Sequence, residues 1–384
     1  MSTATESAPA TTVARPADKP LGGRFIGATA NYLDERTSIS GLVKEIGRKI
    51  FPDHWSFMLG EIALWSFVVV FLSGSFLTFF FEASMAPTHY NGAYAPLRGI
   101  EMSAALESTL NISFDLRGGL LVRQLHHWAA LLFIAAIGVH MLRVFFTGAF
   151  RKPRELNWVI GFVLFILAMA LGFTGYSLPD DLLSGNGLRI IDGMIKGLPL
   201  IGTWTSYLLF GGEFPGTAIV NRLYTLHILL LPLILIALIA AHLMLMIINK
   251  HTQFAGPGRT NDNVVGYPMV PIYMSKMGGF LFITFGVLVL IASMFTINPI
   301  WNYGPYDPSP VSAGTQPDWY IGFADGALRL APSNLDVVLF DRTWSFGILL
   351  PVAVLGLFIV LVAIYPFIEA WVTGDKREHH IAQR

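Results

Sequence analysis

The sequence predicts an all-α integral membrane protein, built as a bundle of transmembrane helices. Of its 384 residues, 54% are hydrophobic and only 13% are charged, and the mean hydropathy is +0.58. This composition is too apolar for an ordinary soluble domain. Six stretches also reach the length of about 20 apolar residues that a bilayer requires, and charged residues gather in the segments between them.

The first 39 residues are interpreted as a disordered cytoplasmic tail that precedes the bundle. Residues 1–20 are rich in Ala, Thr and Pro and contain no apolar core, so they do not resemble a signal peptide. Residues 40–54 alternate basic and apolar positions, a pattern typical of a helix lying on a membrane surface.

We expect transmembrane spans near residues 57–81, 120–147, 157–178, 223–248, 278–298 and 346–371. Residues 40–250 would form a four-helix core with the surface helix before it. Residues 251–384 would hold the last long loop and at least two further helices. Short helices are expected in the loops, around 187–196 and 317–330.

The distribution of charge predicts the orientation of the spans. Basic residues precede the first span, follow the sixth and lie between the second and third and the fourth and fifth: Lys44, Arg48, Lys49, Arg151, Lys152, Arg154, Lys250, Arg259, Lys276, Lys376 and Arg377. The other loops carry acidic residues: Glu82, Glu101, Glu107, Asp180, Asp181, Asp307, Asp318 and Asp325. The positive-inside rule then predicts that both ends of the chain are cytoplasmic, and that the second and fourth spans are parallel.

Two global features exclude whole classes of function. The formal net charge is zero, so nothing suggests a nucleic-acid partner. The chain has no cysteine, which excludes disulfides, thiolate-bound iron–sulfur clusters and covalently attached c-type haem.

Four histidines in the second and fourth spans form two matched pairs. His126 and His140 are 14 residues apart, and His227 and His242 are 15 apart. At 100° and about 1.5 Å per residue, each pair lies roughly on one helix face and extends over about 21 Å. Because the two helices are predicted to be parallel, His126 would be level with His227, and His140 with His242. This arrangement predicts two bis-histidine b-type haem sites, stacked across the membrane.

A single histidine in a membrane helix often only bonds a neighbouring helix, but two matched pairs are much harder to explain in this way. His127 has no counterpart on the fourth span and points about 100° away from His126. We therefore interpret it as a packing or hydrogen-bonding residue and not as an iron ligand.

Glycines and arginines are consistent with haem binding. Gly60 and Gly74 on the first span, and Gly161 and Gly175 on the third, are both 14 residues apart and would face the two haem levels, although glycine is common in membrane helices. Three arginines near the ends of the histidine spans are candidate partners for haem propionates, with snorkelling to lipid as the alternative: Arg123, Arg143 and Arg222.

These features, with GYSLP at 175–179 and PDWY at 317–320, identify a resemblance that covers residues 40 to 375. The chain resembles cytochrome b of the quinol–cytochrome c oxidoreductase (cytochrome bc) family. The family carries Pro-Glu-Trp-Tyr in the last long loop, where this chain has Pro317, Asp318, Trp319 and Tyr320.

The resemblance implies a proton-motive Q cycle in a bacterial plasma membrane. Quinol would be oxidised near the outer face, beside the PDWY segment. One electron would go to a Rieske iron–sulfur protein and a cytochrome c, and the other through the two haems to quinone at the inner face. Asp318 would accept a proton, although it could equally be a turn residue after Pro317. Tyr320 and Tyr176 would line the quinol ring.

Two departures indicate a branch of the family. The spacing of 15 on the fourth span resembles photosynthetic and Gram-positive members, and Asp318 in place of glutamate resembles members that use menaquinol. Together with the tail composition, they suggest an actinobacterial protein. For that group the resemblance implies a dimeric complex, a di-haem cytochrome c subunit and a supercomplex with a terminal oxidase.

The inner quinone site is less complete in the sequence. Lys276 stands where the family has a lysine, but Met277 follows it in place of the family's aspartate. His251, Asn249 and Lys250 could supply polar contacts there. Longer family members have eight spans, so further helices would belong to a separate subunit or to residues beyond those given.

Two rival interpretations remain open from the sequence. Another di-haem membrane cytochrome, such as the anchor subunit of a formate dehydrogenase or nitrate reductase, would share bis-histidine haems but would lack PDWY. A secondary transporter could use histidines as proton relays, but it would place them near the bilayer midplane.

Overall fold

The computed structural model describes residues 21–309, 314–332 and 334–382, and it separates into two units, Met1–Lys49 and Ile50–Arg384. In the first unit, α1 (Leu21–Thr37) and α2 (Ile39–Gly47) are helical. A helix, α2, therefore begins where the surface helix was expected, but it ends at Gly47. The expectation of a tail over 1–39 was wrong for residues 21–37, which form a regular helix with Arg36 over the Tyr32 ring, one turn apart; residues 1–20 lie outside the described part.

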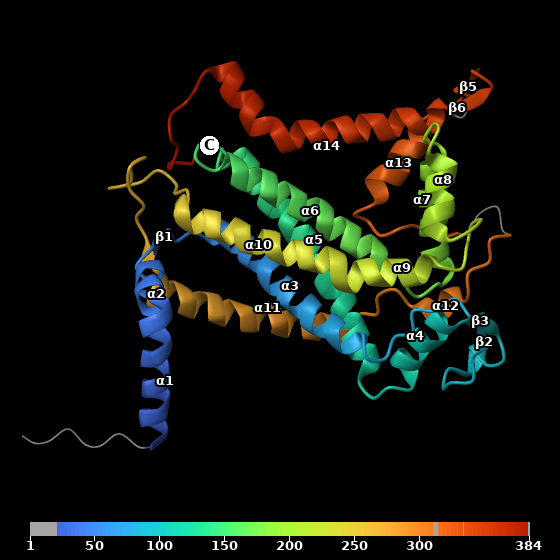
Figure 1. The fold of residues 1–384 in the computed structure, drawn as a ribbon, viewed down its shortest axis with the longest axis horizontal. Coiled ribbons are helices and arrows are strands. Elements are labelled where there is room, and N and C mark those ends of the chain that lie inside the picture. The colour runs from blue at the N-terminus through green and yellow to red at the C-terminus, as the bar shows by residue number, and fades with distance from the viewer. Residues whose placement is uncertain (1–20, 310–313, 333, 383–384) are drawn as a thin grey trace, which may run out of the picture. The chain divides into compact units, whose positions relative to one another are not determined.

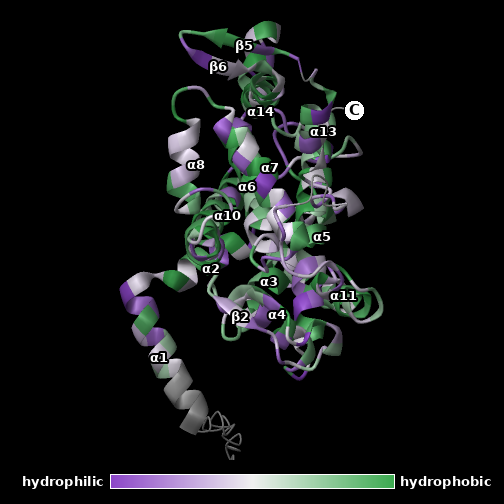
Figure 2. Cartoon of the chain, turned by 90° about the vertical axis from the view of Figure 1, so that its right-hand side faces the viewer, coloured by the Kyte–Doolittle hydropathy of each residue, from purple (hydrophilic) through white to green (hydrophobic). Residues whose placement is uncertain are grey.

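Among its described residues, the second unit contains six helices long and apolar enough to span a membrane, as predicted. They cover Trp55–Leu77 (η1 Trp55–Phe57 and α3 Met58–Leu77), Gly119–Phe146 (α5), Glu155–Tyr176 (α6), Ile219–Ile248 (α9 Ile219–Thr225, the turn η3 Leu226–Leu230 and α10 Leu231–Ile248), Met269–Met294 (η4 Met269–Tyr273 and α11 Met274–Met294) and Phe346–Thr373 (α14). Their residues are predominantly hydrophobic, as the colouring of the cartoon in Figure 2 indicates. The fifth span begins earlier than expected because a kinked π-helical turn at Met269–Tyr273 continues into α11.

Short elements gather at one end of this bundle (Figure 1). They include α4 (Ala104–Phe114), α7 (Leu182–Lys196), α8 (Gly202–Phe210), α12 (Ile300–Tyr303) and α13 (Gly322–Leu330). The hairpins β2 (Pro87–His89) with β3 (Glu101–Ser103) and β5 (Asp336–Leu339) with β6 (Arg342–Ser345), and the helix η2 (Ala95–Leu97), complete this "α7 end". The loop helices expected around 187–196 and 317–330 correspond to α7 and α13, but α13 begins only at Gly322, after a turn at residues 319–321.

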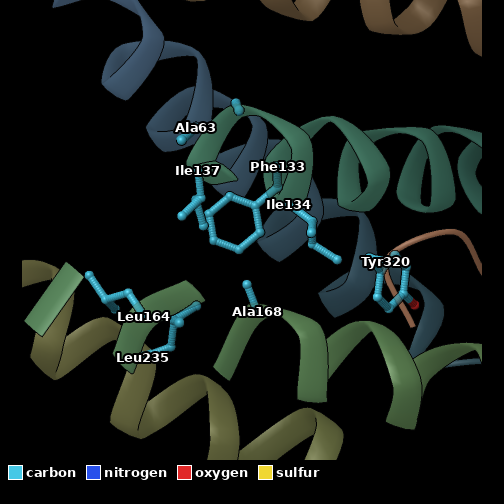
Figure 3. Close-up of a cluster of buried hydrophobic side chains, with 9 residues drawn as sticks. Ala63, Phe133, Ile134, Ile137, Leu164, Ala168, Leu235 and Tyr320 are labelled. Atoms are coloured by element: carbon cyan, nitrogen blue, oxygen red, sulfur yellow. The ribbon is translucent and has the colours of Figure 1, made fainter. Parts of the chain in front are cut away.

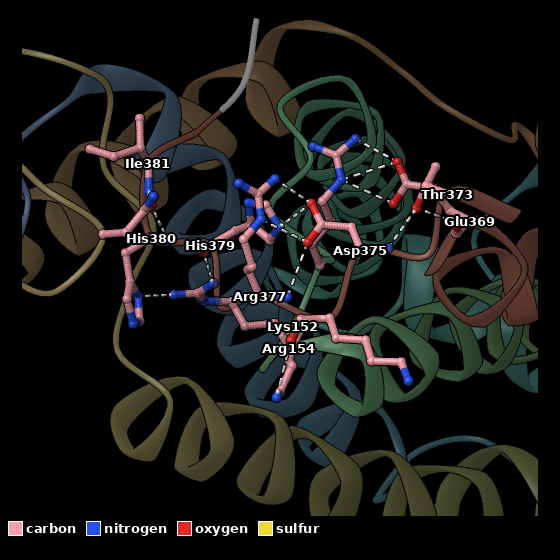
Figure 4. Close-up of polar contacts among 12 residues, drawn as sticks. Lys152, Arg154, Glu369, Thr373, Asp375, Arg377, His379, His380 and Ile381 are labelled. Carbon is pink, nitrogen blue, oxygen red and sulfur yellow. Dashed lines mark hydrogen bonds and ion pairs between the residues drawn. The ribbon is translucent and has the colours of Figure 1, made fainter. Parts of the chain in front are cut away.

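The opposite "β1 end" carries β1 (Ile50–Phe51), paired antiparallel with β4 (Tyr267–Pro268), and the chain after α14. This last segment is fixed by backbone and side-chain hydrogen bonds (Figure 4). Arg154 donates to the His379 carbonyl at 2.6 Å and to His380 Nδ1 at 2.5 Å, and the Gln253 amide donates to the His380 carbonyl at 2.8 Å. These bonds tie the last segment to the loop before α6 and to the loop after α10.

The bundle core lies between the two histidine levels. Phe133, Ile134 and Ile137 of α5 pack against Leu164 and Ala168 of α6 and Leu235 of α10 (Figure 3). In each helix these residues fall between the two positions singled out for haem binding, so apolar packing separates the levels. Tyr320 of the PDWY segment reaches the same cluster with only 3% of its surface exposed.

Candidate functional site

The structure brings His126 of α5 opposite His227 of the η3 turn. Their ring centroids lie 6.3 Å apart with an interplanar angle of 74°. Metal–imidazole bonds are about 2 Å long, so two such bonds and the radii of two rings account for this distance. The geometry fits one metal atom between the two imidazoles, and bis-histidine coordination suits haem iron.

Each imidazole of this first pair is oriented through its Nδ1 atom. His126 Nδ1 is 3.1 Å from the Val70 carbonyl and 3.1 Å from Ser73 Oγ. His227 Nδ1 has the same distances to the Leu171 carbonyl and to Thr174 Oγ1. Such a bond fixes the ring and directs Nε2 to the metal.

A π-helical turn explains the unequal spacing of the histidines. Leu226–Leu230, the turn η3, contains His227. A π-turn accommodates one additional residue and is frequently found at functional sites. The additional residue between His227 and His242 is therefore absorbed locally, and the 15-residue spacing matches the 14-residue spacing on α5.

The four glycines lie against the four histidines, each at its own level. A Cβ atom added at Gly74 would lie 2.8 Å from His126 Cε1, and one at Gly175 would lie 2.6 Å from His227 Cε1. The corresponding distances are 3.2 Å from Gly60 to His140 Cε1 and 3.1 Å from Gly161 to His242 Cε1. The glycines therefore provide room for the imidazoles themselves.

We expect Gly175→Ala to lower the amount of haem bound between His126 and His227. The added methyl group would displace an imidazole that two hydrogen bonds hold in place, and overpacking of this kind costs about 1–3 kcal/mol. Gly286→Ala is the matched control, because a Cβ atom there meets nothing within 4 Å. Haem quantification of both variants checks this, and equal haem in both would contradict the packing role.

The second pair, His140 and His242, lines a cavity of about 280 Å³ at the β1 end. Arg143 also lines it, with its guanidinium 4.4 Å from the centre of the Phe57 ring. The Nε and Nη2 atoms of Arg143 are buried and make no hydrogen bond to the described residues. This guanidinium fits an anionic group such as a propionate.

The other two candidate arginines differ in their surroundings. Arg123 is buried; Nε donates to Ser113 Oγ at 3.0 Å and Nη1 to the Asn298 carbonyl at 3.1 Å, while Nη2 bonds none of the described residues. Arg222 is exposed and donates to the carbonyls of Leu208 and Leu209 at the end of α8. Arg123 thus combines a structural role with a free donor, whereas Arg222 has a local partner.

The PDWY segment places a carboxylate beside the bundle at the α7 end. Tyr320 Oη donates to Asp318 Oδ2 at 3.1 Å, and burial with the neighbouring Asp318 charge raises the pKa of Tyr320 far above its usual value. A Cβ atom at Gly172 would lie 2.5 Å from Tyr320 Oη, so this close approach requires glycine. Pro317 is partly buried, whereas Trp319 is 57% exposed.

His127 has a partner at the site that the sequence did not reveal. Its Nε2 atom lies 3.5 Å from Asp318 Oδ2, although the two residues are far apart in the chain. The sequence suggested a packing or hydrogen-bonding role for His127; the structure places its ring beside a carboxylate of the PDWY loop. Tyr176 is buried nearby at the end of α6, and its hydroxyl bonds none of the described residues.

Lys276 pairs with Asp53 just before η1, and both side chains are half exposed. Met277, and not Lys276, lines the cavity at the β1 end, together with Glu61, Tyr273 and His251. Glu61 was also missed, although an ionisable residue in a membrane span is itself a signal of function.

Three comparisons relate the chain to known proteins. The family model "Cytochrome b(N-terminal)/b6/petB" matches residues 131–305. The cytochrome bc1 complex cytochrome b subunit of Streptomyces coelicolor is 56% identical over 365 residues, covering 95% of this chain and 66% of the relative. The subunit of the same name from Mycobacterium leprae is 52% identical over 373 residues, covering 96% of this chain and 67% of the relative.

The chain thus spans about two thirds of the length of these curated relatives, which come from actinobacteria, as the sequence predicted. A solved "Hyperthermophilic respiratory Complex III" chain has a TM-score of 0.68, with 22% identity and coverage of 88% of this chain and 82% of that one. This likeness supports the fold of the six-helix bundle.

Proposed function

Because the chain belongs to the family of cytochrome b subunits of cytochrome bc1 complexes, we propose that it is the membrane subunit of a quinol–cytochrome c oxidoreductase that carries electrons between two quinone sites. The observation that carries the proposal is the pair His126 and His227, whose rings are 6.3 Å apart with both Nδ1 atoms hydrogen-bonded. A transporter has no need for this arrangement.

Two b-type haems are proposed, one held by His126 and His227 and the other by His140 and His242. Arg123 and Arg143 offer free donors for propionates, and the four glycines accommodate the imidazoles. When bound, the haems supply one-electron redox chemistry along the bundle. The apolar cluster around Phe133 and Leu164 keeps water from the space between them.

At the α7 end, the proposed reaction is oxidation of quinol. Quinol would lose two protons and two electrons: the Asp318 carboxylate would accept one proton and water the other, while one electron would go to an iron–sulfur partner and one toward the haems. Tyr320 Oη and His127 Nε2 both lie near the Oδ2 atom of this carboxylate, at 3.1 Å and 3.5 Å. Tyr176 and Pro317 lie beside it and would contact the ring. The substrate would be menaquinol, in keeping with aspartate in the PDWY segment.

The partners proposed for this reaction are a Rieske iron–sulfur subunit and a cytochrome c subunit of the di-haem type, in a dimeric complex that also associates with a terminal oxidase. The α7 end would face the outside of a bacterial plasma membrane, and both described ends of the chain would be cytoplasmic. The loop charges support this orientation.

A reduced-minus-oxidised visible spectrum of the purified complex tests the proposal. Two b-type haems per copy of the chain are expected, with different midpoint potentials and with the haem of the first pair at the lower potential. A preparation that contains the chain at full yield but has no b-type absorption bands would exclude the function.

A further inference from the structure

We propose that Glu61 supplies a proton to quinone at the β1 end, a role that rests on the proposed function above. Glu61 lies on α3, next to Gly60, which makes room for His140. Its side chain lines the same cavity as His140, His242 and Arg143. With the proposed haem between His140 and His242, a quinone in the rest of that cavity would lie beside both the haem and the Glu61 carboxyl group.

A hydrogen bond holds the Glu61 carboxyl group in a defined position. Tyr273 Oη donates to Glu61 Oε1 at 2.6 Å. This bond leaves the second carboxyl oxygen, Oε2, available for another partner. The Tyr273 ring stacks on Phe51 of β1 at 4.5 Å between centroids, with an interplanar angle of 17°. The pairing of β1 with β4, which lies shortly before Tyr273, holds Phe51 and Tyr273 close to each other.

Polar groups link the carboxyl group to the exposed surface. Lys276 follows Tyr273 by one helical turn and interacts electrostatically with Glu61. The ion pair that Lys276 forms with Asp53 is half exposed. In the proposed role, this exposed pair is where a proton from water would enter on its way to Glu61.

Glu61 can supply the carboxyl group that is absent at Met277, the residue after Lys276. Met277 lines the cavity and cannot exchange a proton. Glu61 provides a carboxyl group from a different helix, on the wall of the same cavity. His251 is less suited to donate, because burial lowers its pKa to about 4 and leaves the imidazole neutral near pH 7.

The proposed step is balanced as follows. Quinone takes up two electrons and two protons. The electrons are those that the proposed function delivers to the β1 end. The O–H bond of the Glu61 carboxyl group breaks, and an O–H bond forms on one quinone carbonyl oxygen. The Glu61 carboxylate then regains a proton from water through Asp53 and Lys276, and water supplies the second proton to the other quinone oxygen.

The pH dependence of this step would also reflect the titration of the other ionisable groups near Glu61. These are Tyr273, Lys276 and Asp53 around the carboxyl group, and Arg143, Arg154, Lys250 and His251 elsewhere on the cavity wall. Among them, only Tyr273 bonds Glu61 directly within the described chain.

The test uses Glu61→Gln in the assembled complex. The b-type haems are reduced, a short-chain naphthoquinone is added, and haem reoxidation is followed with the α7-end site inhibited. We expect the variant to be at least about tenfold slower, because general acid catalysis contributes factors of this size or larger, and to retain both haems. Glu61→Asp should recover part of the rate.

Infrared difference spectroscopy gives a second measurement that does not depend on turnover. Reduction in the presence of the naphthoquinone should change a carboxyl C=O band that shifts in D2O and is missing in Glu61→Gln. Glu45→Gln is the control, because Glu45 is exposed in the N-terminal unit. That variant should retain both the band and the rate.

The outcomes separate the two proposals. If naphthoquinone does not reoxidise the wild-type haems, the proposed function fails at this end. If it does so in the wild type and Glu61→Gln is within twofold of that rate with its carboxyl band unchanged, the role of Glu61 is overturned and the proposed function stands.

Discussion

His126→Leu should leave the protein with about half of its b-type haem. The substitution removes one of the two imidazoles of the first pair, and leucine offers no electron pair to iron. His140 and His242 lie on the other side of the apolar cluster formed by Phe133, Ile134 and Leu164. The second level should therefore retain its haem, and the midpoint potential that remains should be the higher one.

Haem quantification and a redox titration of the purified complex check this expectation. His227→Leu should give the same result, because both variants remove the same haem. His127→Leu is the matched control, since His127 is adjacent in sequence but faces Asp318; it should retain both haems. Two haems in His126→Leu, with both potentials unchanged, would refute the assigned ligand pair.

We expect Asp318→Asn to slow quinol oxidation by about 100-fold, in line with the loss of a general base. Asparagine keeps the size of the side chain and can still meet Tyr320 and His127, but it cannot take a proton from quinol. Both haems should remain, because Asp318 lies outside the two histidine pairs. Stopped-flow reduction of the haems by a menaquinol analogue measures the rate.

Asp307→Asn is the control for Asp318→Asn, because Asp307 belongs to the same long loop and is exposed. It should oxidise quinol at the wild-type rate. An Asp318→Asn complex that matches this control would rule out Asp318 as the proton acceptor and leave it as a turn residue.

The six spans followed from the sequence because membrane-length apolar runs leave little choice of structure. A buried backbone in lipid must satisfy its own hydrogen bonds, and a helix does so within one segment. The short elements α4 and α8 were not foreseen, since their amphipathic or apolar stretches are too short to stand out from loops. The start of the fifth span was misplaced because η4 is a kinked turn.

For the site, too, the sequence predicted what lies within one helix and not the contacts between distant segments. Spacing along one helix is a local property, so the positions of His126, His140 and the glycines could be compared directly in the sequence. The contact between His127 and Asp318 joins α5 to the last long loop, and the contact between Glu61 and Tyr273 joins α3 to η4. No periodicity connects residues that are this far apart in the chain.

The sequence by itself determined the all-helical membrane bundle, the two histidine levels and the PDWY carboxylate, since helical rise and hydropathy act within single segments. Only the tertiary structure decided the partners: which glycine faces which histidine, how a π-turn absorbs the additional residue at His227, and which carboxyl group reaches the β1-end cavity. These depend on how helices and loops distant in the chain pack together, and packing is a property of the folded chain.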